Sequence, residues 1–131
     1  MKYLILIHSN PQSREIWEGF SDAERAEGFS AYAALTEDLA ASGELIVTEA
    51  LADPSLAKRV TVRDGRPMTS DGPFAEVKEH LAGFYFIQCE SIERAIEIAA
   101  RVPEAALPPA LRGPHGLVEV RPVMDLSGLE M

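Results

Sequence analysis

The stretch Tyr3-Leu4-Ile5-Leu6-Ile7 decides which fold this chain is expected to adopt. It is continuously apolar and rich in residues that favour β-structure, and a polar loop is expected directly after it, over residues 8–13. A short apolar run of this kind is typical of a strand that is covered on both faces. We therefore predict that residues 3–7 form a strand in the centre of a sheet.

Two helices are expected to accompany this strand. Ser21-Asp22-Ala23-Glu24 matches a capping box, and apolar residues then recur at helical spacing until Gly43 supplies a stop. Ser91 is a typical helix N-cap, and Pro103 is expected to end the helix that follows it. The apolar face is predicted to hold Phe29, Tyr32, Ala33, Thr36, Leu39 and Ala40 in the first helix and Ile92, Ala95, Ile96, Ala99 and Ala100 in the second.

Further strands are predicted for residues 45–51, 84–89 and 117–121, and a hairpin for residues 58–70. Asp64-Gly65 is the dipeptide that favours a type I′ turn between two strands. Pro67 has no N–H to donate to a ladder, so the returning strand is expected to be an edge strand or a very short one.

Proline also guides the expectation for two other segments. Residues 75–80 are expected to form one helical turn that begins at Pro73 and that Gly83 ends, because proline is favoured at the first helical position. Residues 103–114 contain four prolines and are expected to form a loop.

The predicted order is β-α-β, an inserted hairpin, and β-α-β. This order indicates an α+β protein with a ferredoxin-like βαββαβ fold, an antiparallel sheet and an inserted β-hairpin. We expect one domain over residues 1–131, with a less ordered tail after about residue 124.

The two predicted helices cover only one face of such a sheet, whereas residues 3–7 and 84–89 carry apolar side chains toward both faces. Apolar burial is worth roughly 25 cal/mol per Å², so leaving the second face in water would forgo much of the stability of a small domain. A second copy is the simplest cover. We expect a homodimer packed sheet to sheet, with a small-molecule pocket between sheet and helices or near the subunit boundary.

Composition excludes several classes of protein. With 47% hydrophobic and 25% charged residues the chain is an ordinary globular domain, and its net charge of -9 argues against nucleic-acid binding.

Cys89 is the only cysteine, so neither an intramolecular disulfide nor a thiolate metal cage is expected, and its apolar neighbours favour burial. The apolar run near Met1 is too short for a signal peptide or a membrane span. We expect a cytoplasmic protein without membrane contact.

The segment of residues 70–79 holds the strongest candidate site. Pro73 stiffens it, and several charged side chains crowd around that turn. Asp71 is either a proton-transfer residue whose pKa is raised by burial or a side chain that caps the turn. Lys78 either holds an anionic substrate or is solvated. Phe74, Glu76 and Arg63 are the expected substrate-binding residues.

Histidine offers two further hypotheses. His8, at the end of the first predicted strand, is a candidate for a titrating imidazole at a cavity mouth, or else an ordinary loop residue. Glu76 and His80 are four residues apart, which is the spacing of two metal ligands on one helix, but the sequence offers no further ligands to close such a site. No metal and no cofactor are expected.

The run Asp71-Gly72-Pro73-Phe74-Ala75-Glu76-Val77-Lys78-Glu79, together with the opening residues 1–7 and the closing residues 118–123, resembles the DGPF-domain branch of the YCII-related family. The resemblance spans nearly the whole chain. It implies a small bacterial protein with the dimeric α/β-barrel form of the ferredoxin-like fold. Many members are encoded beside alternative sigma factors, and related families include isomerases, lyases and cofactor-free oxygenases that act on small cyclic or aromatic compounds.

One departure from the family bears on function. The broader family carries a histidine on its first helix, and Tyr32 stands at that position here, so a His-Asp dyad is absent. Tyr32 is able to donate a hydrogen bond or act as an acid, but its ordinary pKa makes it a poor base. Two hypotheses stay open: a cofactor-independent lyase, isomerase or hydrolase with catalytic residues Asp71, Tyr32, Lys78 and His8, or a non-catalytic module that binds a ligand or a protein partner in transcription regulation.

Overall fold

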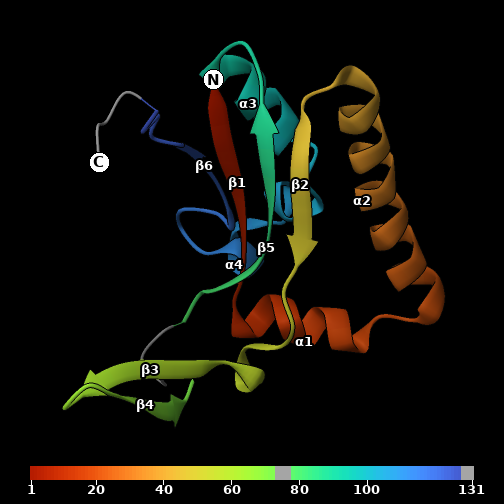
Figure 1. Cartoon of the computed structure of the whole chain (residues 1–131). Helices are drawn as coiled ribbons and strands as arrows, with labels where there is room; N and C mark the ends of the chain where they lie inside the picture. Colours follow the sequence, from red (N-terminus) through yellow and green to blue (C-terminus); the bar gives the residue numbers. More distant parts are fainter. Residues whose placement is uncertain (73–77, 128–131) are drawn as a thin grey trace.

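The computed structural model describes residues 1–72 and 78–127. Its main sheet is antiparallel, with the strand order β2-β5-β1-β6. The strands are β1 (Lys2–Ser9), β2 (Leu45–Ala50), β5 (His80–Gln88) and β6 (Val118–Pro122). Because β5 lies between β1 and β2, and β1 lies between β5 and β6, both βαβ units are split, as Figure 1 shows. The chain therefore has the ferredoxin-like α+β fold predicted from its sequence.

Helix α2 (Asp22–Ser42) begins and ends where the sequence predicts, whereas α3 (Ile92–Ala99) begins as predicted but ends before Pro103, which instead starts a separate 3-10 helix. The Oγ of Ser21 accepts a hydrogen bond from the Glu24 N–H, Gly43 ends α2, and the Ser91 Oγ accepts from the Arg94 N–H. Among the described residues no helix is long and apolar enough to cross a membrane.

The buried stripes of these helices differ from the prediction. Leu35 and Leu39 are the buried residues of α2, while Phe29, Ala33 and Ala40 are exposed. In α3 the buried residues are Ala95, Ile98 and Ala99, while Ile96 is 54% exposed and Ala100 is exposed too. The reason is helical spacing, because residues 95, 98, 99 and 102 share one stripe and residue 96 is turned away from it.

The core lies between the sheet and these two helices. Tyr3, Ile5 and Ile7 of β1 are buried there, with Tyr85 and Ile87 of β5. The alternate side chains point to the other side of the sheet. We call this surface the open face and define it by Leu4, Leu6, Val47, Phe84 and Phe86. These side chains are half-buried or exposed, so the middle of the open face is apolar, as the sequence predicts, while Arg121 and Glu119 of β6 lie beside Leu4 and Leu6 at its border.

The loop predicted for residues 8–13 is wrong. Strand β1 continues to Ser9, and helix α1 (Pro11–Gly19) follows. Asn10 is its N-cap: the Oδ1 accepts from the Ser13 N–H at 2.7 Å, and the Ser13 Oγ accepts from the Asn10 N–H at 3.0 Å. The Asn10 amide also donates to the carbonyl oxygen of Leu111 at 2.9 Å. Asn-Pro was therefore a helix start, with proline in the first turn.

Proline starts short helices in the second predicted loop as well. Residues 103–114 contain the 3-10 helix η2 (Pro103–Ala106) and the helix α4 (Pro109–Arg112). The prediction of a loop there is wrong, because Pro103 and Pro109 are each the first residue of a short helix, where the missing N–H costs nothing.

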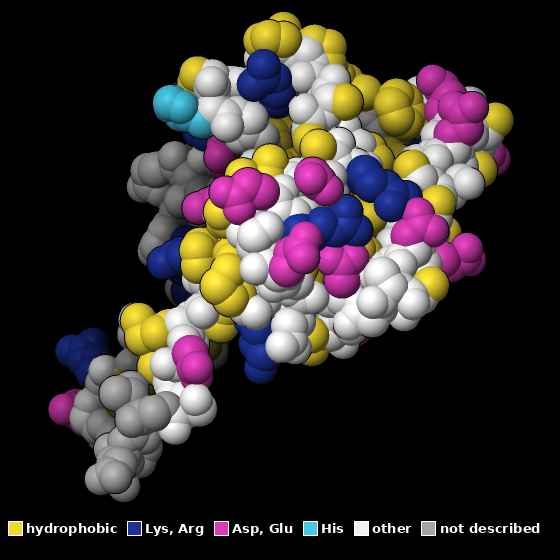
Figure 2. All heavy atoms as spheres, turned by 90° about the horizontal axis from the view of Figure 1, so that it is seen from above, with side chains coloured by type: hydrophobic (Ala, Val, Ile, Leu, Met, Phe, Trp, Pro, Cys, Tyr) yellow, Lys and Arg dark blue, Asp and Glu magenta, His cyan; other side chains and the backbone are white. Residues whose placement is uncertain are grey.

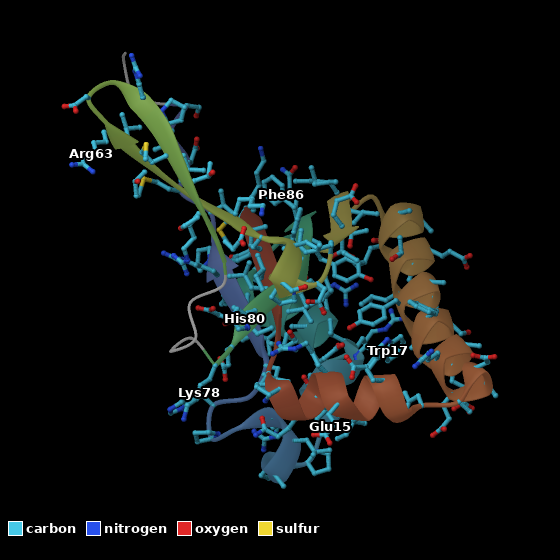
Figure 3. All side chains as sticks on the ribbon, turned by 90° about the horizontal axis from the view of Figure 1, so that it is seen from below. Glu15, Trp17, Arg63, Lys78, His80 and Phe86 are labelled. Carbon is cyan, nitrogen blue, oxygen red and sulfur yellow. The ribbon has the colours of Figure 1, made fainter. Side chains whose placement is uncertain are left out.

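Strands β3 (Lys58–Arg63) and β4 (Arg66–Asp71) form the predicted hairpin as a separate two-stranded sheet. Asp64 and Gly65 have φ angles of 51° and 75°, as a type I′ turn requires. Pro67 is tolerated because β4 is an edge strand. We call residues 58–71 the hairpin arm. Figures 1 and 3 both show the hairpin arm standing away from the rest of the chain, and Figure 2 shows acidic and basic side chains intermixed on the surface seen from above.

The helical turn predicted for residues 75–80 falls largely outside the described residues. At its far end the prediction is wrong, because His80 is the first residue of β5. Gly83 lies within β5 rather than ending a turn. A Cβ atom on Gly83 would lie 3.0 Å from the Glu49 carbonyl oxygen, so its lack of a side chain allows β2 to approach β5 closely.

Candidate functional site

A cavity of about 700 Å³ lies between the sheet, α1 and α2. Its walls are predominantly apolar and aromatic. They include Trp17 and Phe20 of α1, Phe29 and Tyr32 of α2, and Tyr85 of β5. Residues 48–54 of β2 and the segment after it form another wall, and η2 closes part of the cavity. Both the size and the lining are those of a small-molecule site.

The aromatic wall joins α1 to α2. The Trp17 ring lies edge-on to the Phe29 ring, with 5.3 Å between the ring centroids, and 5.8 Å from the Phe20 centroid. It packs on Gly28, where a Cβ would lie only 3.1 Å from a ring carbon of Trp17. Figure 3 shows Trp17 between the two helices. Glycine at position 28 therefore lets the indole approach α2 closely at the edge of the cavity.

One polar pair stands in this apolar surrounding. The Tyr32 hydroxyl donates a hydrogen bond to the Glu104 carboxylate of η2. Burial, and then the charge of Glu104 and this hydrogen bond, hold the pKa of Tyr32 far above its ordinary value of 10.0. The phenol is thus a proton donor at every physiological pH, with a carboxylate beside it.

A second layer of hydrogen bonds fixes the backbone of Tyr32. The Thr36 hydroxyl donates to the Tyr32 carbonyl oxygen at 2.9 Å and lies 3.0 Å from the Tyr85 hydroxyl. The Tyr85 hydroxyl is also 3.3 Å from the same carbonyl. Tyr85 is only 2% exposed, so these groups find their partners within the protein. The arrangement positions Tyr32 rigidly over the cavity.

The structure brings only some of the predicted site residues to this cavity. Tyr32 and His8 line it, and the His8 Nε2 lies 3.5 Å from the Glu119 carboxylate. Asp71 is at the end of β4, where its side chain is 82% exposed and forms an ion pair with Lys58. Arg63 and Lys78 are exposed, and Figure 3 shows both far from Trp17. The predictions for Phe74 and Glu76 fall outside the described residues.

A second hollow, of about 600 Å³, lies at the base of the hairpin arm. It shares residues 51–54 with the cavity as a common wall. His80 lines it, with both ring nitrogens enclosed and without a hydrogen-bond partner in the described part of the chain. Because His80 is in a strand, the helical spacing that suggested a metal pair with Glu76 does not apply.

Sequence reasoning missed Glu104, Thr36 and Tyr85 as site residues. Glu104 is separated from Tyr32 by 72 positions and stood in a predicted loop. The sequence offered one indication of the residues around Tyr32: Thr36 follows it at helical spacing, which puts both side chains on the inner side of α2.

Comparison with known proteins gives the family. A model of the YCII-related domain matches residues 1–127. The chain belongs to the YCII-related family. An uncharacterised protein of Rhizobium meliloti (strain 1021) is 28% identical to this YCII-related chain over 123 residues, which cover 94% of the chain and 92% of that protein. The family predicted from the sequence is confirmed, and the narrower DGPF-domain branch stays a prediction.

Proposed function

We propose that this YCII-related protein binds a small cyclic or aromatic molecule in the cavity between the sheet, α1 and α2. The observation that supports this proposal is the half-buried Tyr32–Glu104 pair, which lies in a predominantly apolar and aromatic lining that also includes Arg14, Glu18 and Asp53. Such a cavity takes an apolar ligand body, while a few polar groups fix its orientation. A ligand hydroxyl is able to accept a hydrogen bond from Tyr32 and to donate one to Glu104.

The same pair favours proton transfer without a cofactor as the reaction class. In the proposed step the Glu104 carboxylate removes a proton from the carbon beside a ring carbonyl. The C–H electron pair forms a C=C bond, and the carbonyl π electrons move to the oxygen, giving an enolate. Tyr32, which keeps its proton, donates a hydrogen bond to that enolate oxygen. In a β,γ-unsaturated ketone the enolate is conjugated with the ring C=C bond, so return of the proton from Glu104 to the γ-carbon moves that double bond into conjugation with the carbonyl and isomerises the substrate.

Binding is tested with 4-nitrophenol, whose absorbance reports its ionisation and hydrogen bonding. We expect saturable binding that Tyr32→Phe and Glu104→Gln each weaken about tenfold, which corresponds to about 1.4 kcal/mol. Glu37→Gln on the exposed side of α2 is the matched control and leaves binding unchanged. Equal affinity in all four proteins would refute the assigned site.

Proton transfer is tested separately with cyclohexanone in D₂O, by following the loss of its α-proton signals by NMR. We expect the protein to accelerate the exchange and Glu104→Gln to abolish the acceleration. Binding of 4-nitrophenol without accelerated exchange would support the alternative, in which the protein is a non-catalytic ligand-binding module.

The roles predicted for Asp71, Lys78, His8, Arg63, Phe74 and Glu76 stay predictions. The Asp71 side chain is 82% exposed, so a catalytic role in an enclosed site would require a second molecule to cover it. A protein partner in transcription regulation and the cytoplasmic location likewise stay predictions.

The homodimer expected from the sequence is part of the proposal. Its support is the open face, which is apolar although α2 and α3 pack on the opposite side. The chain also exposes 9273 Å² at a mass of 14.3 kDa. A compact monomer of that mass exposes roughly 6,800 Å². The surplus is of the order of the surface that each subunit buries in an obligate homodimer.

Light scattering tests this dimer. We expect twice the mass of one chain at micromolar concentration, and one chain for Leu6→Asp on the open face. Glu119→Asp, in the adjacent position of β6, is the control and keeps the dimer. A monomeric unmodified protein would refute the dimer.

A further inference from the structure

The hairpin arm exposes apolar side chains in the described part of the chain. On one of its faces lie Val60 beside Thr69 and Val62 beside Pro67, next to the Lys58–Asp71 ion pair. Val60 and Val62 are 63% and 72% exposed. On the opposite face Met68 pairs with Thr61 and is 48% exposed. Every residue of β4 is exposed.

A two-stranded hairpin whose apolar side chains are exposed to water gains little stability from burial. Two strands without a third strand or a packed layer are marginally stable in water at best. Within residues 1–72 and 78–127, the arm pairs with no strand of the main sheet. The Val60–Val62 face therefore requires a cover, and the question is which molecule supplies it.

Charge points to a second copy of this chain. The hairpin arm carries four Lys and Arg side chains against two Asp, whereas the rest of the chain carries eight Lys and Arg against nineteen Asp and Glu. The arm is thus basic and the body strongly acidic. Arg59, Arg63 and Arg66 lie on the face of the arm opposite to Val60 and Val62, so their charges attract the partner from a distance and not across the docked surface. Two copies that exchange arms would each bring a basic arm close to an acidic body, whereas like-charged bodies would otherwise repel each other.

The direction of the arm agrees with this partner. Figure 3 shows the arm and Phe86 on the same side of the sheet, opposite to α1. Phe86 belongs to the open face. A second copy that packs on the open face would therefore lie on the side toward which the arm extends.

We propose that the hairpin arm of each copy docks, through its Val60–Val62 face, on the body of the second copy in the dimer. This inference rests on the proposed homodimer and adds a second contact to it. Docking covers the Lys58–Asp71 pair along with the two valines, because these side chains share one face of the hairpin. Asp71 then becomes an interface residue, although it is exposed in the single chain.

Hydrogen exchange tests whether the arm is covered. The unmodified protein is compared at micromolar concentration, where it is dimeric, and at a dilution at which light scattering finds monomers. We expect peptides from residues 58–71 to exchange at least tenfold more slowly in the dimer. Equal exchange of the arm in dimer and monomer would overturn the proposal.

Two neighbouring substitutions test which face docks. Val62→Asp places a charge on the docking face, and Thr61→Asp places the same charge on the opposite face of the same strand. Both side chains are exposed, so neither substitution is expected to unfold the body. We expect Val62→Asp to raise the dimer dissociation constant at least tenfold and Thr61→Asp to change it less than threefold. Equal effects would overturn the assignment of the face.

The outcomes separate this inference from the homodimer itself. A dimer that Leu6→Asp breaks, but that Val62→Asp leaves unchanged, would refute arm docking and keep the sheet-to-sheet dimer. A protein that is monomeric at all concentrations would refute both. An arm that exchanges rapidly in the dimer would show that a different molecule, if any, covers it.

Discussion

Glu104 and Asp71 are two acidic side chains in opposite surroundings. Glu104 accepts a hydrogen bond from Tyr32 inside an apolar cavity, whereas Asp71 pairs with Lys58 on the exposed hairpin arm. The segment around Asp71 looked far more reactive in the sequence, because charged residues crowd there. The comparison teaches that enclosure, and not the local density of charge, gives a carboxylate an environment that differs from water. Four changes break or sharpen this comparison.

The largest effect on the free energy of unfolding is expected from substituting a glycine beside the cavity, and we compare it with a glycine in the hairpin arm. Gly83→Val would push a side chain against the Glu49 carbonyl, which the β2–β5 ladder holds in place, at a cost of about 3 kcal/mol. Gly65→Ala in the hairpin turn meets no neighbour but requires a φ of 75°, at a cost of about 1 kcal/mol. Urea unfolding measures both. If Gly65→Ala lowered the free energy of unfolding more than Gly83→Val does, the close approach of β2 to β5 at Gly83 would not matter for stability.

The ionisation of Tyr32 is expected to make the free energy of unfolding depend on pH in alkaline solution. Its pKa is raised by burial and by Glu104, so above pH 10 the unfolded chain loses a proton that the folded protein keeps. The free energy of unfolding is therefore unaffected by this group below that pH and falls above it, by at most about 1.4 kcal/mol per pH unit. Tyr32→Phe should flatten the dependence measured by urea unfolding between pH 9 and 11. An unchanged slope would mean that Tyr32 is not enclosed.

Thr36→Val tests the hydrogen bonds behind Tyr32. Valine keeps the shape of threonine but removes the hydroxyl that joins Tyr85 to the Tyr32 carbonyl. We expect a loss of about 1 kcal/mol in the free energy of unfolding, together with weaker 4-nitrophenol binding. A variant with full stability and full binding would show that these hydrogen bonds do not position Tyr32.

The smallest effect is expected from Asp71→Asn. The Lys58–Asp71 pair is exposed, so its loss should change the free energy of unfolding of the single chain by less than about 0.5 kcal/mol. Binding of 4-nitrophenol should be unchanged. Weaker binding of 4-nitrophenol by this variant would indicate that Asp71 belongs to the binding site, as the sequence suggested.

Some elements could be predicted because their causes are local. The capping box at Ser21, the stop at Gly43 and the Asp64-Gly65 turn depend on residues a few positions apart, and each lies where expected. The start of α1 was equally local, but Asn10-Pro11 was interpreted as a loop although the same pair also begins a helix. Errors of this kind arise where one local pattern fits two structures.

The sequence by itself determined the strand order of the split βαβ units, the hairpin and the apolar character of both sheet faces, because hydrophobic periodicity and turn chemistry act over short distances. Only the tertiary structure decided that Glu104 meets Tyr32 and that Asp71 is exposed. Those outcomes depend on how distant segments pack, and packing is set by the whole chain at once.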